Sequence, residues 1–191
     1  MKTLWPPDVV ERYRIHFDQM RSSVGDDLKA VLDHFGPTPP DKAWLLLERI
    51  VTWSVYTEKP LSLPERMYAG TIAMLSDVQN GGFHQYFANS SGDYWEDVLF
   101  TLRAAGDADS ERHLLRTIEI FPDASPSTDR ATRNAQLVLI EAQDEAAMWA
   151  HFSRQDDEYY DQAYPTYETL WLALHQVPNQ PFIPYIEPGT Q

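Results

Sequence analysis

The apolar residues of this chain recur at helical spacing along most of its length, and the pattern is densest between residues 80 and 122. Phe83, Tyr86 and Phe87 lie three and four positions apart, which places them on one face of a short helix. Two further stripes follow at helical spacing: Trp95, Val98, Leu99, Leu102 and Ala105, then Leu114, Leu115, Ile118 and Phe121. The region predicts three consecutive helices, with Phe83, Phe87, Trp95, Leu99 and Leu102 buried together.

Glycine and aspartate mark the ends of these predicted helices. Asn80-Gly81-Gly82 is a turn signal, and we expect at least one of the glycines to adopt positive φ, which glycine does without steric cost. Gly106 follows the second stripe, where a helix C-terminus favours a left-handed residue. Asp107 is then placed to cap the third helix.

The rest of the chain repeats the helical pattern and contains no useful run of alternating strand residues. Further helices are predicted over 8–20, 25–35 and 41–57, after Ser62, after Ser125-Pro126, and around 160–174 with a break at Pro165. The helix after Ser125-Pro126 carries one clean apolar stripe: Ala131, Ala135, Val138, Leu139, Ala142, Ala146 and Trp149. We expect an all-α fold, a single compact domain of about eight helices.

The proline-rich run at residues 36–40 is the best candidate for an internal boundary. It suggests an N-terminal helical extension over 1–40, packed on a main helical domain over 41–178. Residues 179–191 carry several prolines and predict an extended tail.

Composition favours a globular acidic protein. The 191 residues are 43% hydrophobic and 13% aromatic, enough for a real core, and the net charge is −14. Such a charge repels DNA and anionic membranes, so a basic nucleic-acid binder is excluded and a basic partner or simple solubility is favoured. The longest apolar runs are far too short to span a membrane, and no signal peptide is evident, so we expect a cytoplasmic protein.

The residue types that carry chemistry do not form a recognisable site. There is no cysteine, and the six histidines lack the spacing of a zinc-protease helix. Asn80-Gly81-Gly82 lacks the lysine and preceding strand of a phosphate loop, and no serine stands in a nucleophile elbow. We therefore expect no catalytic residues, no metal, no cofactor and no enzymatic activity.

The distribution of acids is more informative than their number. From residue 134 onwards there are nine acids and one base, Arg154. Carboxylates on rigid helices can offer the lysines and arginines of a DNA-binding protein an alternative to phosphates. The predicted partner-binding residues are Glu141, Asp144, Glu145, Asp156, Asp157, Glu158 and Asp161, extended by Asp93, Glu96 and Asp97.

One motif carries a family resemblance. Asn80-Gly81-Gly82-Phe83, with Gln85-Tyr86-Phe87 and Asn89, resembles the signature of the bacterial family of DNA mimic protein nineteen, whose other members are mostly of unknown function. The similarity extends to Gly106 between two helices and covers roughly residues 63–174. It implies a helical fold, no known enzymatic activity, and occupation of a DNA-binding protein. We interpret these motif residues as mainly structural, fixing the turn between two helices.

The sequence thus suggests a non-catalytic acidic protein that binds a basic partner. The family resemblance makes this more specific: a DNA mimic that occupies a DNA-binding transcription regulator, such as a helix-turn-helix protein. An immunity-type or other interaction protein is an alternative. A small-molecule-binding domain around His84 and Tyr86 is another. Homodimer formation is left open, and no direct nucleic-acid or membrane partner is expected.

Overall fold

The computed structural model describes residues 32, 61, 63–161 and 167–176. The chain divides into two compact units, and nearly all described residues belong to the one from Arg66 to Pro178. The helices predicted before residue 61, the break at Pro165 and the tail over 179–191 lie outside the described residues. The proposed boundaries of the N-terminal extension and main domain therefore stay predictions.

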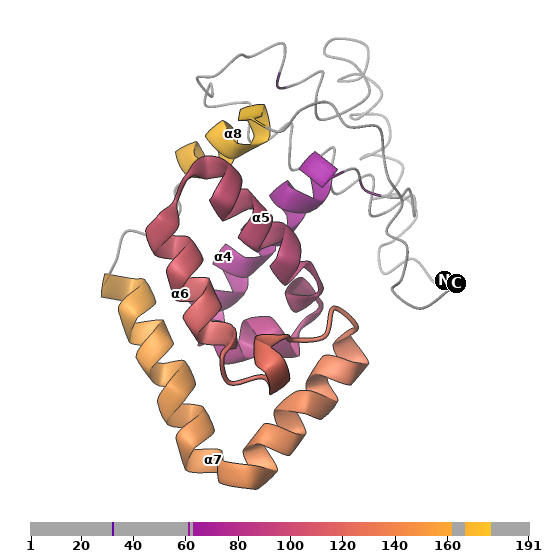
Figure 1. Ribbon diagram of the computed structural model, residues 1–191, viewed down its shortest axis with the longest axis vertical. Coiled ribbons are helices and arrows are strands. Elements are labelled where there is room, and N and C mark those ends of the chain that lie inside the picture. Colours follow the sequence, from indigo (N-terminus) through magenta and orange to yellow (C-terminus); the bar gives the residue numbers. More distant parts are fainter. Residues whose placement is uncertain (1–31, 33–60, 62, 162–166, 177–191) are drawn as a thin grey trace, which may run out of the picture. The chain divides into compact units, whose positions relative to one another are not determined.

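The described part of the chain is helical and contains no strand. Its elements are α4 (Leu63–Ala88), the 3-10 helix η1 (Ser90–Tyr94), α5 (Trp95–Ala105), α6 (Ala108–Ile118), the 3-10 helix η2 (Pro122–Ala124), α7 (Arg130–Asp161) and α8 (Tyr167–Gln176) (Figure 1). The all-α prediction is confirmed for these residues. They account for five α-helices, so the expected number of about eight is not confirmed.

Within this unit, α5 contacts helices on two sides. It packs against α6 and α8, while α6 also packs against the long helix α7. Phe83, Phe87, Trp95, Leu99 and Leu102 lie in one buried cluster, as predicted. The second half of α7 completes the cluster with Met148, Phe152 and Tyr159.

The glycine turn interrupts α4 without ending it. Gly81 has φ −167° and Gly82 has φ 75°, so the predicted positive φ is found at Gly82. The same segment then continues as helix to Ala88. The glycines therefore put a sharp bend between the part of α4 that carries Met74 and the part that carries Phe83 and Phe87.

The connection between α5 and α6 matches its sequence signals. Gly106 is left-handed at φ 72°, and the Asp107 carboxylate accepts a hydrogen bond from the Ser110 backbone N–H at 3.1 Å. Asp109 and Glu111 lie in the first turn of α6, where the helix dipole favours acids.

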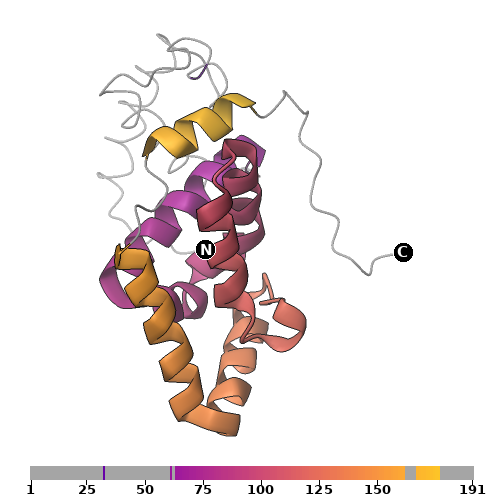
Figure 2. The ribbon, with the colours of Figure 1, turned by 60° about the vertical axis from the view of Figure 1, so that its left-hand side comes forward.

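The start of α7 differs from the prediction. The helix begins at Arg130 rather than at Pro126, because the Asp129 carboxylate caps it by accepting the Thr132 backbone N–H at 2.8 Å. A second difference lies in the middle of α7. Asp144 has non-helical angles, φ −160° and ψ 89°, which break α7 into two arms that diverge from this bend (Figures 1 and 2).

The clean apolar stripe that the sequence shows in α7 is exposed rather than buried. Val138 and Leu139 are 61% and 63% exposed, and Ala131, Ala135, Ala142, Ala146 and Trp149 are exposed as well. The buried side of α7 consists instead of Arg133, Leu137, Met148, Phe152, Gln155 and Tyr159. Arg133 and Gln155 on that inward face are polar, so the apolar periodicity of the sequence does not identify them.

Candidate functional site

The ten carboxylates predicted to bind a partner fall into two groups in the structure. Glu96, Glu141, Glu145, Asp157 and Asp161 are exposed, and Asp144 is exposed at the break of α7. The other four are half-buried: Asp93, Asp97, Asp156 and Glu158. The structure therefore does not bring all ten together as one free acidic surface.

Each half-buried carboxylate has a partner inside the protein. Glu158 accepts a hydrogen bond from Arg116 Nη2 at 2.6 Å, and Asp97 is 3.1 Å from Arg66 Nε. Burial raises the pKa of Asp97, and the Arg66 charge beside it opposes that rise. These carboxylates hold elements together and offer less to an external cation.

Asp156 supports the glycine bend in α4. Its Oδ1 accepts the Phe83 backbone N–H at 2.8 Å, the first N–H after the bend. A Cβ atom on Gly82 would lie only 2.7 Å from the Asp156 carboxyl carbon, so glycine is needed there for space as well as for φ. Burial raises the pKa of Asp156, and the Phe83 bond opposes that shift.

Asp144 has a local structural role beyond its charge. Its carboxylate accepts the Ala147 backbone N–H at 2.9 Å, so it caps the second arm of α7. Glu145 then lies in the first turn of that arm. A carboxylate at the start of a helix is favoured by capping and by the helix dipole. Glu141 and Glu145 therefore stand on different arms of α7, on either side of the break at Asp144.

The polar motif residues point at a single carboxylate in α4. Asp77 Oδ1 accepts hydrogen bonds from Gln85 Nε2 and Asn89 Nδ2, each at 3.1 Å, and Asp77 Oδ2 accepts one from the Ser91 hydroxyl. Asp77 precedes the glycine bend, whereas its three donors follow it. This network joins the two halves of α4 to η1 across the bend.

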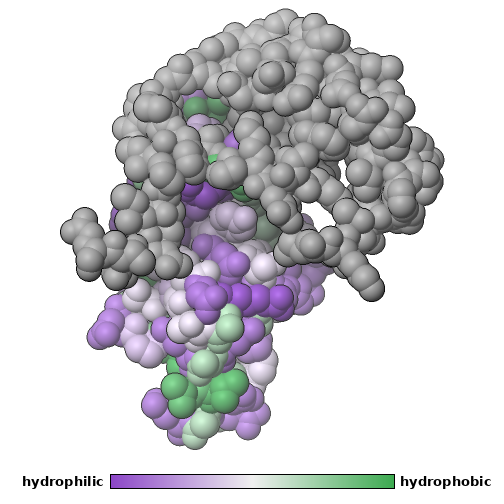
Figure 3. All heavy atoms as spheres, turned by 90° about the vertical axis from the view of Figure 1, so that its right-hand side faces the viewer, coloured by the Kyte–Doolittle hydropathy of each residue, from purple (hydrophilic) through white to green (hydrophobic). Residues whose placement is uncertain are grey.

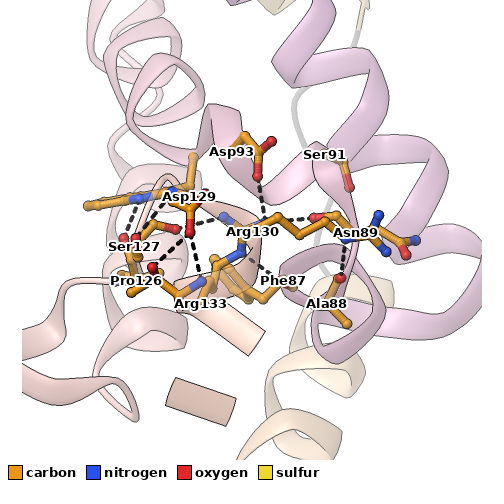
Figure 4. A network of polar contacts seen from close by, with 12 residues as sticks. Phe87, Ala88, Asn89, Ser91, Asp93, Pro126, Ser127, Asp129, Arg130 and Arg133 are labelled. Carbon is orange, nitrogen blue, oxygen red and sulfur yellow. Dashed lines mark hydrogen bonds and ion pairs between the residues drawn. The ribbon is translucent and has the colours of Figure 1, made fainter. Parts of the chain in front are cut away.

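Arg133 is the most deeply buried charge of the described region, and the sequence reading missed it. Its Nε donates to the Phe87 carbonyl at 2.6 Å, and its Nη1 donates to the Ser127 carbonyl at 2.6 Å. Its Nη2 donates to the Asn89 carbonyl and the Asp93 carboxylate, both at 2.7 Å (Figure 4). The side chain is 0% exposed.

The Arg133 network ties the end of α4 and η1 to the segment that leads into α7. Neighbouring contacts strengthen the same joint: Arg130 Nε donates to the Ala88 carbonyl at 3.1 Å, and Trp95 Nε1 donates to the Pro126 carbonyl at 2.9 Å. A signal for Arg133 does exist in the sequence, because it stands four residues before Leu137 on what becomes the inward face.

His84 and Tyr86 do not share their surroundings. The half-buried His84 ring lies 4.6 Å from the Trp149 ring and 5.5 Å from the Phe152 ring. Burial lowers the pKa of His84, partly opposed by the charges of Glu141 and Asp156. The Tyr86 ring is wholly buried, 4.8 Å from Phe87, and burial raises the pKa of its hydroxyl far above the usual range.

The described residues contain neither a metal-binding cluster nor a membrane-spanning helix. No group of three or more His, Asp or Glu side chains there is arranged to hold a metal ion. None of the helices described is both long enough and apolar enough to cross a membrane.

Comparison with known proteins links the chain to one family. The family model described as DMP19-like protein matches residues 59–175, well over half of the chain. No protein with curated annotation and no solved structure matches. The matched range includes the glycine bend, the Asp77 network and both arms of α7. The chain therefore belongs to the family of DMP19-like proteins.

Proposed function

We propose that this protein acts without catalysis, by presenting carboxylates of α7 to a basic protein, and that this partner is a DNA-binding regulator whose DNA site it occupies. The observation that carries the proposal is the exposure of Glu141, Glu145, Asp157 and Asp161 on α7. Membership of the DMP19-like family supports the same direction.

The arginines of this region explain why these four carboxylates stay available. After residue 60 the chain has seven arginines and no lysine. Five of the arginines form ion pairs inside the described part of the chain: Arg66, Arg103, Arg112, Arg116 and Arg133. Their acidic partners are Asp97, Glu111, Asp109, Glu158 and Asp93. These pairs engage most of the arginine charge with other acids, and Arg130 and Arg154 are the two arginines that stay exposed on α7.

Exposed helical carboxylates suit a DNA-binding partner. Such proteins bind duplex DNA largely through lysine and arginine contacts to phosphates, and those contacts carry no sequence information. Asp157 and Asp161 lie one helical turn apart, about 6 Å along the axis. A rigid array of this kind competes for the same cations without reproducing a base sequence.

Capture followed by competition tests the proposal. The purified protein is immobilised, proteins retained from an extract of its own cells are identified, and the main one is purified. We expect a basic protein that binds labelled duplex DNA, and we expect added wild-type protein to release that DNA. A nuclease or toxin whose activity is neutralised would favour an immunity function instead. A partner that binds DNA and this protein simultaneously would contradict DNA mimicry.

A further inference from the structure

The first arm of α7, residues 130–143, has two opposite faces. Arg133 and Leu137 are buried, and Ile140 packs partly buried against the core. At 100° per residue, the opposite face carries an exposed apolar strip: Ala131, Ala135, Val138, Leu139 and Ala142. We call these five residues the outer strip.

The outer strip differs from the scattered apolar residues of an ordinary surface. Val138 and Leu139 are among the most exposed large hydrophobic residues of the described region, and they are adjacent. Figure 3 shows apolar side chains gathered at the end of the unit where α7 bends, with hydrophilic residues around them. A contiguous exposed apolar patch rimmed by polar residues is typical of a protein-binding site.

The shape of the strip favours a helix as its occupant. Ala131, Ala135 and Ala142 have short side chains on either side of the larger Val138 and Leu139. Packed helices approach to about 8–10 Å, and short side chains at the contact permit the nearer end of that range. An apolar ridge on a partner helix would fit over the alanines and against the valine and leucine.

The charges next to the strip set the chemistry of that helix. Glu141, Asp144 and Glu145 lie at or just after its C-terminal end, all exposed. Arg130 is the exposed arginine of this arm, and its side chain donates a hydrogen bond to the Ala88 carbonyl. A second copy of this chain would bring the same sign of charge to the interface. A helix with lysine or arginine beside its apolar ridge would complement it.

We propose that the outer strip and its acidic end bind a basic amphipathic helix of the partner protein. This inference rests on the proposed function and adds to it an apolar contact that phosphates of DNA do not make. The acids would govern the approach and salt dependence of the complex, whereas Val138 and Leu139 would contribute affinity that persists at high salt.

Two synthetic peptides test the proposal. Each has about 18 residues, because isolated helices shorter than about 12–15 residues are only marginally stable. Both carry the same leucine and alanine ridge, one flanked by lysine and arginine and the other by glutamate. Fluorescence anisotropy of labelled peptide gives the dissociation constant for each. We expect the basic peptide to bind and the acidic peptide to bind at least about tenfold more weakly.

Matched variants separate the apolar contact from the charges. Val138→Gln with Leu139→Gln should weaken the basic peptide about tenfold or more, because it removes two apolar contacts while keeping good helix formers. Leu115→Gln with Leu172→Gln, two exposed leucines on α6 and α8, is the control and should leave binding unchanged. Glu141→Gln with Glu145→Gln should reduce binding mainly at low salt.

Three outcomes would overturn the proposal. The first is that the basic peptide does not bind, and the second is that both peptides bind equally well. The third is that the Val138 and Leu139 variant binds the basic peptide as tightly as the wild type does. Analytical sedimentation gives the oligomeric state of the wild type and of this variant. If the wild type is a dimer and the variant is a monomer, the strip binds a second copy of the chain instead. If the carboxylate variant alone loses binding, the proposed function survives and the helix inference fails. If neither pair of substitutions matters, both fail.

Discussion

At the scale of single residues, the structure uses polar side chains to fix its bends. Asp156 and Arg133 join segments far apart in sequence, 73 positions for Asp156 with Phe83 and 46 for Arg133 with Phe87, and Asp77 joins the two sides of the glycine bend. A buried polar group that is fully hydrogen-bonded fixes one arrangement, whereas the same group left unpaired is costly. These three residues should therefore matter for stability more than exposed charges do.

Arg133 gives the largest expected effect. Replacing it with methionine keeps much of its volume but leaves the Phe87, Ser127 and Asn89 carbonyls without this donor. We expect the free energy of unfolding to fall by about 3–5 kcal/mol, as when a buried ion pair loses one partner. Arg112→Met, which removes an exposed pair with Asp109, should cost less than about 1 kcal/mol. Urea denaturation measures both, and equal losses would refute a structural role for Arg133.

Gly82 and Gly106 offer a comparison at nearly equal φ, 75° and 72°. Gly106, with ψ 20°, is left-handed helical, where alanine costs about 1 kcal/mol. Gly82, with ψ −177°, lies in a region essentially open to glycine alone, where alanine costs about 1–3 kcal/mol. A Cβ on Gly106 meets nothing within 4 Å, whereas one on Gly82 meets the Asp156 carboxylate. Gly82→Ala should therefore lower the thermal midpoint clearly more than Gly106→Ala. A smaller effect at Gly82 would show that Asp156 does not pack as described.

His84 should make stability depend on pH. Its pKa is lowered by burial, so the folded protein binds the proton less readily than the unfolded chain. Stability from this group is complete above its ordinary pKa of about 6.5 and falls as the pH drops toward the lower folded value. His84→Gln should then lose less stability than wild type between about pH 7.5 and about pH 5.5. If urea titrations show that wild type and variant lose the same stability over this pH range, His84 does not contribute to the pH dependence.

At the scale of elements, α4 to α6 and the presence of a helix at α7 could be predicted, whereas the break and the inward face of α7 could not. Gly81, Gly82, Gly106 and Asp107 are local signals, and each acts within a few residues of the bend or cap that it forms. The inward face of α7 is set by contacts with distant segments. Arg133 and Gln155 occupy it, so apolar periodicity alone selected the opposite face.

The same reasoning applies to the predicted acidic surface. A sequence gives the number and spacing of carboxylates, but internal cations decide which of them remain free. Arg133 and Arg116 engage Asp93 and Glu158 across 40 and 42 positions. Glu141 and Glu145 could be identified from the sequence as acids near each other, whereas the break between them at Asp144 could not.

Asp144 tests that break directly. Asp144→Ala removes the cap on the second arm of α7 and should cost about 1 kcal/mol of stability. Asp144→Asn removes the same charge but keeps an oxygen that can accept the Ala147 N–H, so it should cost much less. Denaturant titration of both variants separates capping from charge. Equal losses would mean that the charge, and not the cap, is what the helix requires.

At the scale of the whole molecule, some charged side chains form ion pairs within the protein and others are exposed for a partner. Five of the seven arginines after residue 60 form ion pairs with other acids, two of these pairs at the surface, and Glu141 and Glu145 remain exposed beside the outer strip. A surface with both features would bind its partner in a partly salt-dependent manner. The central claim is that these α7 carboxylates form the partner-binding surface.

Calorimetric titration of the captured partner tests that claim most directly. Glu141→Lys with Glu145→Lys is compared with wild type and with Asp109→Lys, Glu119→Lys, which makes the same charge change on α6 and its C-cap, each at low and high salt. We predict that the α7 variant loses binding, that the α6 variant binds nearly as wild type, and that wild-type affinity falls with salt. Equal affinities for all three proteins at both salt concentrations would contradict the account.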